Sequence, residues 1–97
     1  MAKFIVRVEL RNSESADYDA LHEKMSSHGF YKFAKFPGDE QNFTLPNAEY
    51  LFYGVKASEN INYVGYLARA VAEKIRTNPK ILVTEMKDSL QLGLDKF

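Results

Sequence analysis

The order of hydrophobic periodicities along the 97-residue chain constrains its fold most. Residues 3–10 alternate apolar and polar side chains, which is typical of a strand with one buried face. Residues 16–27 and 61–75 instead repeat apolar side chains every three or four positions, as amphipathic helices do. Three further segments have strand composition: 30–36, 49–56 and 80–87. The predicted order is therefore strand, helix, strand, strand, helix, strand.

Residues at the ends of these segments predict where the helices begin and end. Ser15 is a candidate N-cap for the first helix, and we expect that helix to stop at Gly29 because glycine tolerates the left-handed conformation. Ser58 or Asn60 is expected to cap the second helix. Pro79 ends that helix, since the residue before a proline avoids helical angles.

This order predicts an α+β fold over residues 1–87, a ferredoxin-like βαββαβ sandwich. Two right-handed crossovers place both helices on one face of a four-stranded antiparallel sheet. Residues 88–97 form a tail that keeps several apolar side chains: Leu90, Leu92, Leu94 and Phe97. Because a disordered tail is rarely this apolar, we expect it to dock on the domain, with a short fifth strand as one way of doing so.

Composition narrows the functional classes. The chain has no cysteine, 13 basic and 13 acidic residues, and no window that resembles a membrane span or a signal peptide. We therefore expect a cytoplasmic protein without a membrane partner, a metal site or a cofactor. A balanced charge argues against strong non-specific binding to DNA or other nucleic acid, which depends on phosphate neutralisation, although a local basic patch would remain compatible with RNA.

The sheet face opposite the helices is expected to carry bulky apolar side chains, which marks an interaction surface. Candidate interface residues are Phe33, Tyr53 and Leu92. A second copy of the chain is the favoured occupant because two-fold homodimers are common. RNA bases stacked on the aromatic rings and a different protein are the two other candidates.

Five polar residues are candidates for chemistry, and each has a plainer explanation. Glu9 lies near the end of the first strand and Arg11 lies just beyond it; they suit a carboxylate and a cation acting on phosphate, but also a solvated ion pair. His28 suits a general acid or base, but also a helix C-terminus. Lys32 and Lys35 suit phosphate contacts, but also protection of a strand edge. Tyr31 follows the end of the first helix and precedes the two lysines, and its aromatic ring would stack on an RNA base.

Several of these features together resemble the GhoS family of small antitoxins from toxin–antitoxin systems. The resemblance lies in the short strand at 4–9, the helix exit at 25–30, the long connection after residue 36, the entry at 46–50 and the helix from Ser58. It implies a fold like the CRISPR-associated adaptation nucleases and an endoribonuclease that cleaves a specific messenger. It also implies catalysis by Glu9 and Arg11, to which the residues add His28. The alternative hypothesis is a non-enzymatic protein, of phage or mobile-element type, that binds another protein through its open sheet face.

Overall fold

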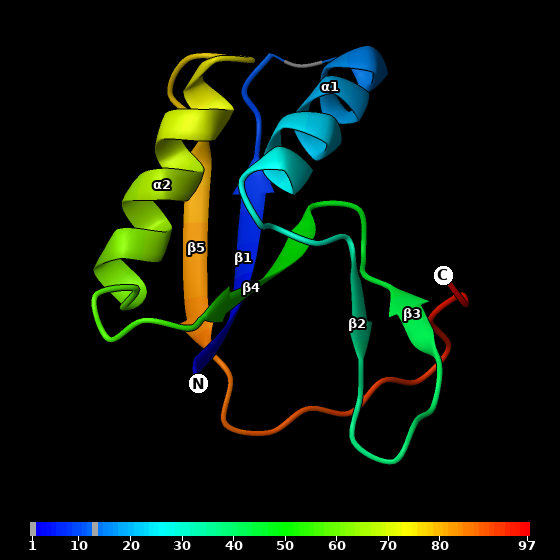
Figure 1. Ribbon diagram of the computed structural model, residues 1–97. Helices are drawn as coiled ribbons and strands as arrows, with labels where there is room; N and C mark the ends of the chain where they lie inside the picture. The colour runs from blue at the N-terminus through cyan, green and yellow to red at the C-terminus, as the bar shows by residue number, and fades with distance from the viewer. Residues whose placement is uncertain (1, 13) are drawn as a thin grey trace.

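The structure is a computed structural model that describes residues 2–12 and 14–97. Met1 and Ser13, both within the predicted domain, lie outside the described residues. Two helices and five strands follow one another in the order β1 (Ala2–Glu9), α1 (Ser15–Ser27), β2 (Phe33–Lys35), β3 (Asn42–Thr44), β4 (Glu49–Gly54), α2 (Ile61–Glu73) and β5 (Lys80–Glu85). Both helices lie on the same face of the sheet that contains β1 (Figure 1).

The main sheet has three antiparallel strands in the order β4-β1-β5. Val6 at its centre is opposite Tyr50 on one side and Val83 on the other. β2 and β3 pair in a separate antiparallel sheet of two strands. The expectation of four strands in one sheet is therefore wrong, although the α+β class and the antiparallel pairing are correct.

The second sheet separates from the main sheet at Lys32, directly after Tyr31. Tyr31 exchanges two backbone hydrogen bonds of 2.8 Å with Leu51 of β4, as the predicted pairing requires. The chain bends at Lys32, and β2 then pairs with β3, which the sequence pattern did not predict. Residues 42–44 follow β2 after a short turn, so they offer a closer partner than β4 does.

The helix ends follow capping chemistry. Glu14, rather than Ser15, caps α1: its backbone N–H donates to Asp17 Oδ2 at 2.9 Å in a reciprocal capping box. Asn60 is the cap of α2, where its side-chain oxygen accepts from the backbone N–H of Tyr63 at 3.0 Å. Gly29 follows α1 with a φ of +86°, which agrees with its predicted role.

The core lies between the helices and the main sheet. Alternation in β1 turns Phe4, Val6 and Val8 toward the helices, and all three are buried. The side chains that meet them are also buried: Tyr50 and Phe52 from β4, Leu21 and Met25 from α1, and Val64, Ala68 and Val71 from α2. Each large side chain buried here contributes about 1.5–3 kcal/mol, so this cluster holds the two helices in place.

The opposite face of the sheet is partly covered by the chain itself. Ala34, Leu45 and Leu51 form a second buried cluster, against which Ile5 and Met86 pack. The end of the tail extends the small sheet, because Thr44 N–H donates to Asp95 O at 2.8 Å and residue 96 bridges residue 43. The open face is therefore narrower than the sequence pattern suggests.

The tail does not form a strand where its leucines alternate. Residues 90–94 have no regular secondary structure, and the Leu90 and Leu92 side chains are 81% and 84% exposed. In the part of the chain that the structure describes, neither helix has the length and apolar composition needed to cross a membrane.

Candidate functional site

The three catalytic candidates lie at two opposite ends of the sheet. Glu9 Oε1 is 3.7 Å from Lys80 Nζ, and Arg11 Nε donates to Asn78 O at 2.6 Å, both near the end of β1. His28 instead lines a hollow with Tyr53, which is opposite Lys3 at the start of β1. The strand rises over six residue steps from Lys3 to Glu9, a distance of about 20 Å. The structure therefore does not bring Glu9 and Arg11 together with His28.

His28 borders a hollow that we call the aromatic concavity, with a volume of about 540 Å³. It lies where the end of α1, the end of β4 and the start of α2 meet, and it is lined by His28, Gly29, Tyr31, Phe52, Tyr53, Val55, Glu59 and Tyr63. Tyr31 and Tyr63 are 38% and 43% exposed, so their rings are available to a ligand. Of these residues, only His28, Tyr31 and Tyr53 were predicted from the sequence as site or interface residues.

Local backbone geometry shapes the concavity. The positive φ of Gly29 turns the chain sharply between α1 and Tyr31. A Cβ at Gly29 would lie 3.6 Å from the Phe52 ring, so the backbone passes close to that ring. On the other side, Glu59 Oε1 accepts from the backbone N–H groups of Val55 at 3.1 Å and Lys56 at 2.9 Å. That carboxylate fixes the loop that forms the rim of the concavity.

A row of rings continues from the concavity toward the tail. Ring centroids are 6.1 Å apart between Tyr53 and Tyr31, 5.5 Å between Tyr31 and Phe33, and 4.2 Å between Phe33 and Phe97. Lys3 Nζ lies 5.9 Å from the centroid of the Tyr53 ring. This aromatic row, Tyr53–Tyr31–Phe33–Phe97, contains two of the three residues predicted as an interface and places the third, Leu92, outside it.

The imidazole of His28 has a defined orientation. Its Nδ1 lies 2.9 Å from Lys24 O and 3.1 Å from Ser27 Oγ. Because a carbonyl oxygen only accepts, Nδ1 carries the hydrogen in the contact with Lys24. In the neutral imidazole, Nε2 is then an unprotonated acceptor. This is the arrangement that a general base requires.

Lys32, predicted as an RNA contact, directs its ammonium group to the protein backbone. Its Nζ donates to three backbone carbonyls: Leu45 at 3.2 Å, Pro46 at 2.6 Å and Glu49 at 3.1 Å. Burial lowers the pKa of Lys32 to about 8, and the nearby Glu49 carboxylate opposes that shift. Through its three hydrogen bonds, the ammonium group holds the segment that leads into β4 close to residue 32. Lys35, by contrast, is exposed at the end of β2.

Next to Lys32 is a second group of titratable side chains, His22 and Tyr50. His22 Nδ1 is hydrogen-bonded to the hydroxyl of Tyr50, and Lys32 Nζ lies 5.2 Å from the centroid of the Tyr50 ring. Burial lowers the pKa of His22, and the Lys32 charge adds to this shift. Burial also raises the pKa of the Tyr50 hydroxyl. These groups satisfy one another, which indicates a structural role.

No protein-family model, curated protein or solved structure matches this chain.

Proposed function

We propose that this protein is a regulator that acts on RNA and that single-stranded RNA binds across the aromatic concavity. The observation that carries the proposal is the clustering of three aromatic rings around His28: the exposed rings of Tyr31 and Tyr63, and the half-buried ring of Tyr53. Every base has a π-face, so such rings bind single strands with little dependence on sequence. Stacking on one ring contributes about 1–3 kcal/mol per base.

The charge distribution predicts what kind of binding this would be. The chain has no net charge, and Lys3 lies beside the Tyr53 ring. Binding that depends mainly on stacking releases few counterions, so affinity should fall only slightly as salt increases. A steep salt dependence would instead indicate binding through phosphates alone.

The proposal extends to the fold. The order β5-β1-β4, followed by the bridge from Leu51 to Tyr31, supports a ferredoxin-like arrangement in which β2 has largely left the sheet. That arrangement, and the resemblance to the GhoS family, both support an antitoxin-type regulator. They also suggest messenger RNA as the target.

We further propose that His28 gives this surface a cleavage activity. His28 Nε2 would take the proton of a ribose 2′-hydroxyl, and the 2′ oxygen would then bond to the adjacent phosphorus. The bond from phosphorus to the 5′ oxygen breaks, and that oxygen receives a proton from a water molecule. The resulting hydroxide takes back a proton from the His28 imidazolium, which returns His28 to its neutral form. The products are a 2′,3′-cyclic phosphate and a 5′-hydroxyl end. Glu9 and Arg11 have no part in this scheme because they lie at the other end of β1.

Binding is tested with a labelled single-stranded RNA of mixed sequence by fluorescence anisotropy. Tyr31→Ala and Tyr63→Ala should each raise the Kd about 5- to 150-fold, which corresponds to one lost stacking partner. Tyr66→Ala is the matched control, because this exposed tyrosine lies on α2 outside the concavity. Wild-type affinity in both concavity variants, or no binding by the wild type, would overturn the binding proposal.

Cleavage is tested separately on the same RNA and on a copy whose ribose 2′-hydroxyls are methylated. The wild type should cut only the first, leaving cyclic phosphate ends, and His28→Gln should bind with unchanged affinity but not cut. Cleavage of the methylated RNA, or undiminished cleavage by His28→Gln, would refute the role given to His28.

One observation favours a different function, that of a non-enzymatic protein-binding factor. Leu90, Leu92 and Phe97 are exposed apolar side chains in the tail, and such side chains are common in protein interfaces. A pull-down that recovers one stoichiometric protein and no RNA would support this alternative.

A further inference from the structure

β5 presents an unpaired backbone edge. It is the outermost strand of the main sheet and pairs only with β1. Met86 N–H donates to Lys3 O at 2.8 Å, so even-numbered residues of β5 direct their backbone groups toward β1. The N–H and C=O groups of Ile81, Val83 and Glu85 therefore point outward, and no hydrogen bond within residues 2–12 and 14–97 engages them.

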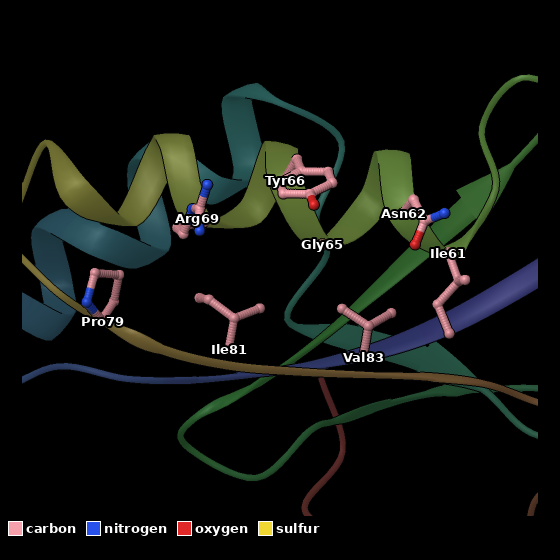
Figure 2. Close-up of a pocket in the computed structure, with 8 residues that line it drawn as sticks. All are labelled: Ile61, Asn62, Gly65, Tyr66, Arg69, Pro79, Ile81 and Val83. Atoms are coloured by element: carbon pink, nitrogen blue, oxygen red, sulfur yellow. The ribbon is translucent and has the colours of Figure 1, made fainter.

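A groove runs beside this edge, between β5 and α2 (Figure 2). Its volume is about 360 Å³, and it is lined by Ile61, Asn62, Gly65, Tyr66, Arg69, Pro79, Ile81 and Val83. Figure 2 shows Arg69 at the end of the groove near Pro79 and Ile81, and Ile61 at the opposite end. The floor is apolar, and Arg69, whose Nε lies 3.6 Å from Glu73 Oε1 on the same helix, brings a guanidinium group to one end.

We infer that β5 pairs with β5 of a second copy of this chain, antiparallel about a two-fold axis at Val83. The outward backbone groups of Val83 meet those of the partner's Val83, and Ile81 pairs in both directions with the partner's Glu85. A two-fold axis perpendicular to the sheet pairs residues whose side chains lie on the same face of the sheet. Ile81, Val83 and Glu85 all lie on one face, so this pairing is possible for them. The result is one continuous sheet of six strands, three from each copy.

Charge complementarity favours a second copy over an unrelated peptide. Glu85 is opposite Phe4, so its side chain lies on the helix face of the sheet. In the paired arrangement, the partner's Glu85 lies opposite Ile81, in the part of the groove that Arg69 also lines. Each interface thus brings two equivalent Glu85 carboxylates to the ends of the grooves where the Arg69 guanidinium groups lie, each beside its own Glu73. Centring the axis on Leu82 instead would require a hydrogen bond from Pro79, which has no N–H.

The test is the mass of the full chain in solution, measured by sedimentation equilibrium over a range of concentrations. The wild type should form dimers, and Glu85→Arg and Arg69→Glu should each weaken association about tenfold or more. The double variant with both changes should regain association, because the two charges are exchanged. Glu23→Arg on the exposed face of α1 is the control for the change in net charge and should dimerise like the wild type. A monomeric wild type, or a double variant no better than the single ones, would overturn the inference.

Cross-linking tests the register, since the chain has no cysteine of its own. With the axis at Val83, Leu82 lies opposite the partner's Thr84, close enough for a disulfide. The double variant Leu82→Cys, Thr84→Cys should therefore form covalent dimers on mild oxidation, whereas Leu82→Cys alone should not. Leu82 is 65% exposed and Thr84 is exposed, so both variants should keep the fold. Covalent dimers from Leu82→Cys alone would refute the Val83 register.

Discussion

Replacing Gly54 by alanine is the most demanding test of the packing around the aromatic concavity. Gly54 ends β4, immediately before the loop that carries Val55 and Glu59. A Cβ at this position would lie 2.7 Å from the backbone oxygen of Glu59 and 2.9 Å from Cε2 of Phe4. Both distances are shorter than real contacts of a Cβ, so at least one neighbour must move.

Neither neighbour moves easily. The Phe4 ring is buried in the core, and the Glu59 backbone is held because the side chain of the same residue accepts two hydrogen bonds. Inserting a methyl group into a packed site costs about 1–3 kcal/mol, and we expect the upper half of that range here. Because Glu59 lines the concavity, RNA affinity should fall together with stability.

Urea unfolding followed by circular dichroism measures the loss. Gly65→Ala is the matched control, since its new Cβ would meet Val83 Cγ2 at an ordinary 3.6 Å. That variant should raise the free energy of unfolding by about 0.5–1 kcal/mol, because alanine suits a helix interior better than glycine does. The packing argument is refuted if Gly54→Ala loses less than about 0.5 kcal/mol, or if Gly65→Ala is the more damaging of the two.

Two further predictions concern pH and the tail. Because burial lowers the pKa of His22 in the folded state, the unfolded chain binds the proton more tightly. The free energy of unfolding should therefore be highest above about pH 6.5 and should fall as the pH drops through the folded pKa. Urea unfolding between about pH 5 and 8 measures this change. His22→Gln should flatten that profile, and an unchanged slope would contradict it. Deleting residues 95–97 removes the backbone bonds at Thr44 and Asn42 and the ring contact with Phe33, so stability should fall by about 1–3 kcal/mol. Amide exchange in β3 should then accelerate, and unaltered exchange would mean that the docked tail contributes nothing.

The elements that could be predicted from the sequence are those whose pattern is local. The alternation in β1 and the apolar stripe of α2 both reflect burial by a single neighbouring layer, so periodicity alone was sufficient. The cap of α1 was misplaced by one residue because Glu14, with Asp17, can supply the same hydrogen bonds as a serine. Capping chemistry admits several residue types, and the pattern does not rank them.

Strand pairing was harder because the partner is chosen at long range. Residues 30–36 have strand composition throughout, yet only Tyr31 pairs with β4 before Lys32 turns inward to the three carbonyls. A lysine in an aromatic segment gives no local sign that its ammonium will hold a distant loop. The competing strand at residues 42–44 has only three residues, too few for a periodicity to be recognised.

The three predicted catalytic residues lie at two ends of the sheet for a reason that the topology itself contains. α1 runs back along β1, so its end lies near the start of β1, and His28 cannot be close to Glu9 at the end of that strand. The order of elements therefore already separated the two groups. Tyr63 was missed because its place outside the apolar stripe of α2 makes it appear solvated, whereas it faces the concavity.

The two proposals use opposite edges of the same sheet, and this makes them independent. The concavity lies at the β4 edge, and the proposed dimer contact lies at the β5 edge, with β1 between them. Pairing through β5 would therefore leave both concavities open, one at each end of the six-stranded sheet. Glu85→Arg should weaken the dimer without changing the affinity of one concavity for a short RNA. A long RNA that reaches both concavities should bind the wild type more tightly than the variant, because the second contact becomes intramolecular.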